Sequence, residues 1–226
     1  LQAEASLLAL RKAGMEPEEL DCVFAGDLLN QCAASVFGLR KLDVPYLGQY
    51  GACSTMAQTI ATASVFVESG AAQRALAVTS SHFCSAERQF RLPLEYGGQR
   101  TPTAQWTATA SGAVILSAEP PAGAVRAVAV REATFGRMVD LGVTDAANMG
   151  AAMAPAAADT LYNYFQDTAT KPDDYDLILT GDGSADFYAG QVNVQLAAAL
   201  GVPTINEVTS IAAEGDKVVV ERTLEE

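Results

Sequence analysis

The sequence has few cations and few aromatic residues. Lysine and arginine together number 14, against 27 aspartates and glutamates, and the formal net charge is −13. A nucleic-acid groove needs clustered cations, so we expect no nucleic-acid partner. A small anion site remains compatible with this balance, because local charge can oppose the total. Aromatic residues make up 7% of a chain that is 50% hydrophobic, so the core is built mainly from small aliphatic side chains.

Histidine and the usual cysteine motifs are also scarce. His82 is the one histidine, and the four cysteines, at positions 22, 32, 53 and 84, form no CxxC pair. Cysteine and histidine spacings of this kind do not match a metal site, so we expect no metal and reduced thiols in an intracellular protein. No apolar run reaches the length of a membrane span, and no signal peptide is visible. Leu1 in place of Met suggests that the natural N-terminus lies further upstream.

Two segments of the chain repeat each other at an offset of 155 positions. Residues 16–27 read EPEELDCVFAGD, and residues 171–182 read KPDDYDLILTGD. Each copy follows a helical pattern and has an acidic turn, an apolar triplet and a final Gly-Asp. A short apolar run after a helix is typical of a parallel strand covered on both faces. The gap-free match favours an internal duplication, although helix–turn–strand units also resemble one another without common origin.

Other apolar runs predict further strands. They cover residues 44–49, 75–81, 111–119 and 124–135, and a Pro-Pro-Ala-Gly turn joins the last two into an expected antiparallel hairpin. A stretch of small residues after Cys53 predicts a helix to about Glu68. Strands that alternate with helices make this an α/β protein.

Cys53 stands where a predicted parallel strand runs into a helix. Ligands of open α/β sheets collect at such strand ends, and a helix N-terminus favours a thiolate. The alternative is a small buried residue in a tight turn, and the local pattern leaves both readings open. A cysteine nucleophile needs a base, and His82, just past the strand 75–81, is the one conventional candidate. A histidine there is more often a hydrogen-bonded structural residue.

A loop from residue 82 to residue 100 concentrates arginines in this acidic chain. Arg88, Arg91 and Arg100 alternate with aromatic side chains. Arginine forks match carboxylates, so the loop is a candidate for holding a small dicarboxylate or a phosphate. The alternative is that these arginines form salt bridges with Glu87 and Glu95.

These motifs resemble the family of stage V sporulation protein AD, a branch of the thiolase-like superfamily. The resemblance covers residues 1–182 and is carried by GACSTM, AVTSSH, SAERQFRLPLEYGGQRTPTAQWTATASGAVILS, DLGVTDAANMGAAMAPAAADT and DYDLILTGD. It implies a layered αβαβα fold made of two similar halves. We expect residues 1–135 to form a nearly complete first half that lacks the family's first segment. Residues 136–182 would begin a second half that is truncated or replaced.

The resemblance also implies a function. Cys53 matches the nucleophile position of condensing enzymes, whose histidine bases come from the second half, and no histidine follows residue 82. We therefore expect no condensing catalysis and no cofactor. The implied role is binding of dipicolinic acid for uptake into the spore, and we place the ligand on Cys53, Ser54, His82, Arg88 and Arg91. An acyltransferase that loads Cys53 is the alternative.

The same resemblance implies partners and a location. We expect contacts with other spore uptake-channel proteins, at the periphery of the inner membrane of the developing spore. We also expect a homodimer, formed through the strand 75–81 as in other thiolase-fold proteins.

Residues 183–226 leave this pattern and are similar to the β subunit of electron-transfer flavoproteins. Asp186, Gly190 and Gln191 match the stretch that contributes to an AMP or flavin nucleotide site in that family. The spacing of apolar residues predicts a helix over 189–200. An electron-transfer flavoprotein fragment is therefore the second alternative function.

Overall fold

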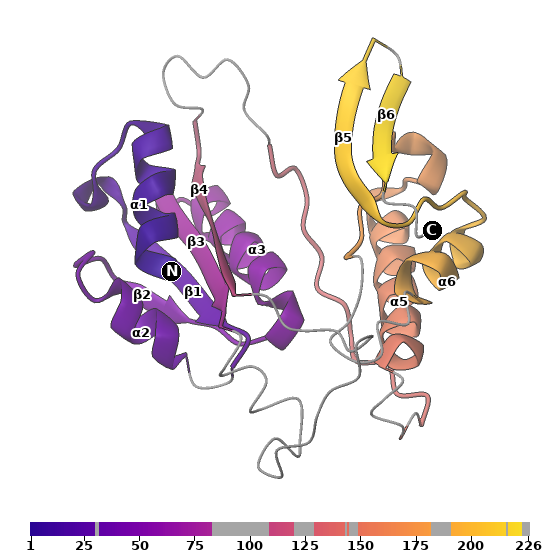
Figure 1. Ribbon diagram of the computed structural model, residues 1–226, viewed down its shortest axis with the longest axis horizontal. Coiled ribbons are helices and arrows are strands. Elements are labelled where there is room, and N and C mark those ends of the chain that lie inside the picture. The colour runs from indigo at the N-terminus through magenta and orange to yellow at the C-terminus, as the bar shows by residue number, and fades with distance from the viewer. Residues whose placement is uncertain are drawn as a thin grey trace. The chain divides into compact units, whose positions relative to one another are not determined.

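The computed structural model describes residues 1–29, 32–82, 109–119, 129–142, 144, 149–181, 191–215 and 217–222. The chain divides into two compact units, with the main boundary between residues 133 and 134 (Figure 1). The first unit holds α1 (Gln2–Ala13), η1 (Pro17–Glu19), β1 (Cys22–Asp27), α2 (Ala33–Leu39), β2 (Tyr46–Gly48), η2 (Ala52–Ser54), α3 (Thr55–Glu68), β3 (Arg74–Ser81) and β4 (Ala110–Ser117).

The first unit is a four-stranded sheet in the order β2-β1-β3-β4. The strands β2, β1 and β3 run parallel, with Val23 opposite Tyr46 and Leu76, and β4 pairs antiparallel with β3. β1 is apolar along most of its length and wholly buried, as a strand covered on both faces must be. The α/β fold predicted from the sequence is confirmed.

Helices cover both faces of this sheet. One face packs against α1 and α2 through a cluster that contains Leu10, Val23, Leu39, Leu76 and Val78. The opposite face packs against α3 through a second cluster, which joins Phe24 and small side chains of β3 to Ala63 and Phe66. The alanines of α3 and β3 bring helix and sheet close together, as the low aromatic content predicts.

The predicted strands 44–49, 75–81 and 111–119 are confirmed as β2, β3 and β4, with slightly different ends. The predicted hairpin between 111–119 and 124–135 is wrong for the residues that the structure describes. β4 pairs with β3, and residues 129–135 form no strand that could pair with its other side.

The second unit contains α5 (Met149–Thr168), η4 (Pro172–Asp174), α6 (Gln191–Leu200), β5 (Val208–Glu214) and β6 (Lys217–Arg222). The predicted helix 189–200 is confirmed from Gln191 onward. β5 and β6 form an antiparallel pair whose side chains are almost all exposed. An irregular segment before α5 is fastened to this helix by Arg137, whose guanidinium donates two hydrogen bonds to Asp159.

The two segments that repeat at an offset of 155 positions have the same backbone geometry at the helix end and in the turn that follows. Both helices end on a residue with positive φ, Gly14 at 66° and Ala169 at 53°. The next N–H in each copy donates to a carbonyl five residues back, from Met15 to Leu10 and from Thr170 to Phe165, and both distances are 3.0 Å. The acidic turns η1 and η4 close with the same pair of bonds. The N–H of Glu16 or Lys171 donates to the carboxylate of Glu19 or Asp174, and the N–H of that acidic residue donates back to the carbonyl of Glu16 or Lys171. Helix and turn are therefore repeated in three dimensions.

The strand predicted in the second copy is wrong. Residues 177–180, which match β1, have no regular structure, and Leu177 and Leu179 are 46% and 72% exposed. In the first copy Asp21 fixes β1 to β3 by accepting hydrogen bonds from the N–H groups of Gln73 and Arg74. Apolar sequence alone does not make a strand when no neighbouring strand completes the ladder.

Strand pairing also bears on the expected dimer. β3, through which we expected two copies to associate, is paired with β1 on one side and with β4 on the other. Both of its edges are therefore occupied, and strand addition there is excluded.

Within the described part of the chain, no helix is long and apolar enough to cross a membrane.

Candidate functional site

The candidate site lies where the parallel strands of the first unit's sheet have their carboxyl ends, and we call this the edge of the site. Because β1, β2 and β3 are parallel, they end at the same edge, at Asp27, Gly48 and Ser81. Cys53 follows β2 and His82 follows β3. The edge thus collects side chains from three connections, in the position where open α/β sheets bind ligands.

Cys53 occupies a short helical turn, η2, that leads into α3. The turn is held by the hydroxyl of Ser54, which donates to the carbonyl of Gly51 at 2.7 Å. Thr55 reinforces it by donating to the carbonyl of Ala52 at 2.8 Å and accepting from the N–H of Gly51 at 3.1 Å. These bonds hold the backbone on both sides of Cys53, whereas its own thiol is exposed. The turn therefore presents the thiol on a fixed backbone.

The same turn carries hydrogen-bond donors. Helical turns leave their first N–H groups without intrahelical partners, and in η2 these belong to Ala52 and Cys53. Ala52 adopts a positive φ of 49°, an uncommon conformation for alanine that bends the chain from β2 into the turn. The two N–H groups and the start of α3 favour negative charge at this point. The turn therefore places an exposed thiol beside two backbone N–H groups that can donate to an anion.

A second thiol lies at the same edge, in the connection that follows β1. Cys32 donates a hydrogen bond from Sγ to the carbonyl of Gln49 at 3.3 Å. Its own carbonyl accepts from Ser35, whose hydroxyl also lies 2.8 Å from that of Tyr46. Burial raises the pKa of the Tyr46 phenol above its usual value of 10.0, and the neighbouring Cys32 and Asp27 also favour the neutral form. This polar cluster joins the connection after β1 to β2.

Three buried polar atoms at this edge have no hydrogen-bond partner among the described residues. They are Oε1 of Gln49 and Oγ of Ser81, at the ends of β2 and β3, and Oε1 of Gln2 of α1. Nearby, Gln2 of α1 donates from Nε2 to the carbonyl of Gly26 at 2.7 Å and to the hydroxyl of Ser80 at 2.9 Å. Buried polar groups without partners are costly, so Gln49 and Ser81 mark positions where a further polar group would be bound favourably.

The structure describes three of the five residues predicted to bind the ligand. Cys53, Ser54 and His82 lie at the same edge, and the thiol and the imidazole are exposed. β1 separates the strands that lead to Cys53 and His82, a distance of about 10 Å. Arg88 and Arg91 lie outside the described residues, as do Asp186 and Gly190. Gln191 begins α6 in the second unit, and its side chain is not described.

Sequence reasoning missed Cys32, Gln49 and Ser81 as residues of this edge. Gln49 and Ser81 directly follow or end predicted strands, and that position was the signal that could have identified them. Cys32 gave no comparable signal, because its link to the edge is a long-range bond to Gln49. Among the residues that the structure describes, no group of three or more histidine, cysteine, aspartate and glutamate side chains could hold a metal ion.

Comparison with known proteins identifies relatives of this chain. A family model described as Stage V sporulation protein AD matches residues 1–199. The curated Stage V sporulation protein AD of Bacillus subtilis (strain 168) is 50% identical over 182 residues, which are 80% of this chain and 52% of the relative. The chain therefore spans about half the length of this relative.

Solved structures show the fold. The 3-oxoacyl-(acyl carrier protein) synthase III of Aquifex aeolicus matches with a TM-score of 0.62 at 15% identity, over 90% of this chain and 65% of that chain. A variant of OleA from Xanthomonas campestris matches with a TM-score of 0.61 at 15% identity, over 89% of this chain and 63% of that chain. The fold is thiolase-like.

The family match also bears on the end of the chain. It continues to residue 199, past residue 183, where we expected the pattern to end. The predicted resemblance of residues 183–226 to an electron-transfer flavoprotein gains no support from these matches. The two boundaries between the three predicted domains remain predictions.

Proposed function

The chain belongs to the family of stage V sporulation protein AD, and from this premise we propose that it binds dipicolinic acid without condensing activity. One observation carries the proposal: Cys53 is exposed on a helical turn at the shared edge of three parallel strands. In a thiolase-like fold this is the position of a nucleophile, and here the N–H groups of Ala52 and Cys53 have no partner within the turn.

Dipicolinic acid is a planar pyridine with two carboxylates, so its recognition needs donors at two separated points. The N–H groups of Ala52 and Cys53 form one such point, where helix geometry favours a carboxylate. Arg88 or Arg91 would clamp the other carboxylate with a bidentate fork. His82 and the hydroxyl of Ser54 complete the proposed set. Ser54 can accept a hydrogen bond while it donates to Gly51.

The placement of His82 relative to Cys53 supports binding over condensation. His82 is the one histidine of the given sequence. His82 is exposed and follows a strand that is separated from β2 by β1. A cysteine nucleophile without a base at hydrogen-bond distance is poorly activated. The proposed role is therefore capture of the ligand for uptake into the spore.

The wider setting is part of the same proposal. We propose that the protein acts with other uptake-channel proteins of the developing spore, at the periphery of the inner membrane, and that it forms a homodimer. The free edges of the first unit's described sheet belong to β2 and β4. A strand-paired dimer of this unit would use one of these two edges.

The second candidate is an acyltransferase that loads an acyl group on Cys53. The exposed thiol favours it, as does the name of the synthase from Aquifex aeolicus, which acts on acyl groups carried by a protein. Incubation with acyl-CoA followed by intact-mass measurement tests this function. A stable mass increase that disappears in Cys53→Ala supports it, and an unmodified chain excludes it.

Calorimetric titration with dipicolinate tests the main proposal. The buffer must be free of divalent metal, because a pyridine-2,6-dicarboxylate is itself a chelator. We expect saturable heat with the unmodified chain and at least tenfold weaker binding in Arg91→Ala. Arg131→Ala, which removes an exposed arginine of the first unit's described residues, is the control and is expected to bind normally. Absence of heat with the unmodified chain overturns the proposal.

A further inference from the structure

Gln2 occupies a position on α1 where an apolar side chain is expected. Gln2, Ser6 and Leu10 follow one another at intervals of four, and they are the buried residues of this helix. Of the three, only Leu10 belongs to the apolar cluster beneath α1 and α2. Gln2 is 3% exposed, and its Oε1 has no hydrogen-bond partner among the described residues. A buried amide with an unpaired oxygen costs stability, so packing alone does not explain this glutamine.

The side-chain nitrogen of Gln2 joins the ends of two strands. Its Nε2 donates to the carbonyl of Gly26 at 2.7 Å and to the hydroxyl of Ser80 at 2.9 Å. Gly26 and Ser80 are the next-to-last residues of β1 and β3, so both bonds lie at the edge of the site. One buried side chain therefore fixes the first turn of α1, the end of β1 and the end of β3 relative to one another.

Gly26 packs against the start of the helix that follows Cys53. A β-carbon at Gly26 would lie 2.7 Å from Cγ2 of Thr55, so the end of β1 rests directly against the first residue of α3. Thr55 holds the turn η2 by two hydrogen bonds, one from the N–H of Gly51 at 3.1 Å and one to the carbonyl of Ala52 at 2.8 Å. A displacement of the end of β1 therefore reaches this turn, because closely packed groups transmit strain to their neighbours.

We propose that Gln2 is a positioning residue, which sets the spacing between the turn that carries Cys53 and the connection that begins at His82. The first of these is reached through Gly26, and the second through Ser80, two positions before His82. This inference rests on the proposed function, in which the ligand contacts both Cys53 and His82. Gln2 is buried, so it acts through the strand ends, in the way that supporting residues hold a binding site in its productive geometry.

A purely structural role for Gln2 makes a different prediction. In that case a variant without the two hydrogen bonds unfolds at a lower temperature, while the folded chain keeps its affinity for the ligand. A positioning role predicts a local change within the folded chain, at the turn η2, which α1 reaches only through β1. Hydrogen exchange distinguishes the two roles, because it reports the opening of separate segments as well as global unfolding.

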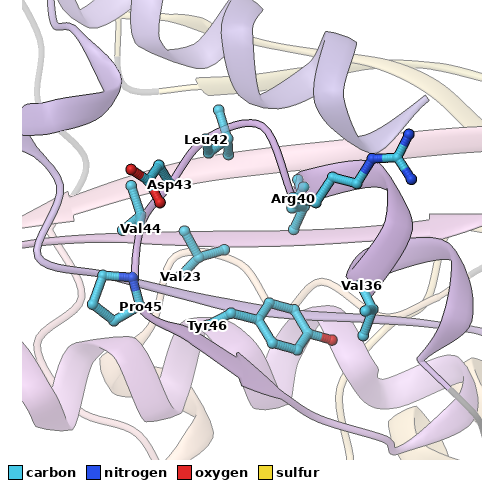
Figure 2. A pocket seen from close by; sticks show the side chains of 9 residues that line it. Val23, Val36, Arg40, Leu42, Asp43, Val44, Pro45 and Tyr46 are labelled. Carbon is cyan, nitrogen blue, oxygen red and sulfur yellow. The ribbon is translucent and has the colours of Figure 1, made fainter.

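The experiment compares Gln2→Met with two control variants of the full chain. Methionine keeps the length of the side chain but donates no hydrogen bond. Ser6→Ala changes the next buried position of α1, whose hydroxyl has no partner among the described residues. Val44→Ala removes packing in a cavity of about 450 Å³ beside α2. Figure 2 shows Val44 there beside Pro45, before β2, whereas Cys53 follows the end of that strand. Val44→Ala therefore controls for a loss of stability as such.

Two measurements give the expected result. Calorimetry should show dipicolinate binding about fivefold weaker in Gln2→Met and changed by less than about twofold in both controls. Without ligand, amide exchange of residues 51–58 should be about threefold faster or more in Gln2→Met alone. Ser80→Ala removes one of the two acceptors, so adding it to Gln2→Met should weaken binding little further, because that bond is already lost.

Three results overturn the proposal. The first is unchanged exchange of residues 51–58 in Gln2→Met. The second is an equal increase in Gln2→Met and Val44→Ala, which would indicate a general loss of stability. The third is faster exchange in Gln2→Met with unchanged dipicolinate affinity. The exchange measurement needs no ligand, so it decides the role of Gln2 even if the unmodified chain binds no dipicolinate, a result that overturns the proposed function by itself.

Discussion

The backbone carbonyl oxygen of Gln49 occupies the space where a β-carbon on Gly26 would stand. The same β-carbon would lie 2.7 Å from Cγ2 of Thr55, in the first turn of α3. Gly26 therefore allows β1, the end of β2 and the start of α3 to approach closely. The close approach fixes the backbone on both sides of Cys53, since Gln49 precedes it and Thr55 follows it.

Gly26→Ala tests this close approach. We expect a loss of about 3 kcal/mol in the free energy of unfolding, at the upper end for an overpacked core, because the obstructing atom belongs to backbone. Gly181→Ala is the matched control, since Gly181 holds the equivalent position in the repeat and a β-carbon there meets nothing within 4 Å. Chemical denaturation followed by circular dichroism, with hydrogen exchange of the β1 peptide, measures both. Equal stability of the two variants would contradict the structure.

Asp21 provides a second test, through acid stability. Hydrogen bonds from the N–H groups of Arg74 and Gln73 hold the pKa of Asp21 below its usual 3.8. A carboxylate with a lowered pKa stabilises the fold at neutral pH, and this contribution is lost as the pH falls through the folded-state pKa. Asp21→Asn should therefore lower stability by about 1 kcal/mol at pH 7, a modest value for an exposed charged bond. The difference from the unmodified chain should shrink below pH 4.

The equivalent aspartate of the second copy is the control for that measurement. Asp176 has no neighbouring strand in the described structure, so Asp176→Asn should leave both the stability at pH 7 and its acid dependence unchanged. Urea midpoints measured from pH 7 to pH 3 would show the contrast. A loss in Asp176→Asn as large as in Asp21→Asn would mean that a second sheet clamps it.

Thiol reactivity should rank the cysteines by their surroundings. Cys53 is exposed, Cys32 is half-buried and hydrogen-bonded, and Cys22 is buried in β1. Burial raises the pKa of the Cys22 thiol above 9.0, and the charge of Asp21 raises it further. Because the thiolate is the reactive form, iodoacetamide should label Cys53 before Cys32, and Cys22 only after unfolding. Peptide mass spectrometry over time measures the order, and early labelling of Cys22 would contradict the buried position of β1.

The contrast between the two repeats explains what the sequence could predict. Local signals located the end of α3 at Glu68, the acidic turn η1 and the four strands of the first unit's sheet, because each depends on a few neighbouring residues, whereas α2 was not predicted. The same signals predicted a strand at Leu177–Leu179, where the chain is irregular and exposed. A strand needs a neighbour, and no local pattern reports whether a neighbour exists.

The candidate site divides in the same way. Cys53 and His82 were found because each directly follows a predicted strand, and parallel strands end at one edge. Cys32 was missed because its place depends on a hydrogen bond to Gln49, seventeen positions away. The link from Gln2 to two strand ends was missed for a related reason, since its acceptors lie 24 and 78 positions away along the chain.

Phe24 and Leu179 test directly whether the apolar triplets of the two copies differ in packing. Phe24 is fully buried, and its ring meets that of Phe66 edge-on, with centroids 4.8 Å apart. Phe24→Ala should lower the free energy of unfolding by about 3–5 kcal/mol, the usual cost of removing a buried aromatic ring. Leu179, the equivalent residue, is 72% exposed, so Leu179→Ala should change stability by less than about 0.5 kcal/mol.

Phe24→Leu keeps the first measurement interpretable if the alanine variant fails to fold. It retains most of the apolar volume and removes the edge-on ring contact, so a loss of about 1–2 kcal/mol is expected. Denaturation of the variants at two protein concentrations separates folding from association. A large, concentration-dependent loss in Leu179→Ala would show that the second triplet is buried against another copy of the chain, because only a partner could then cover this side chain.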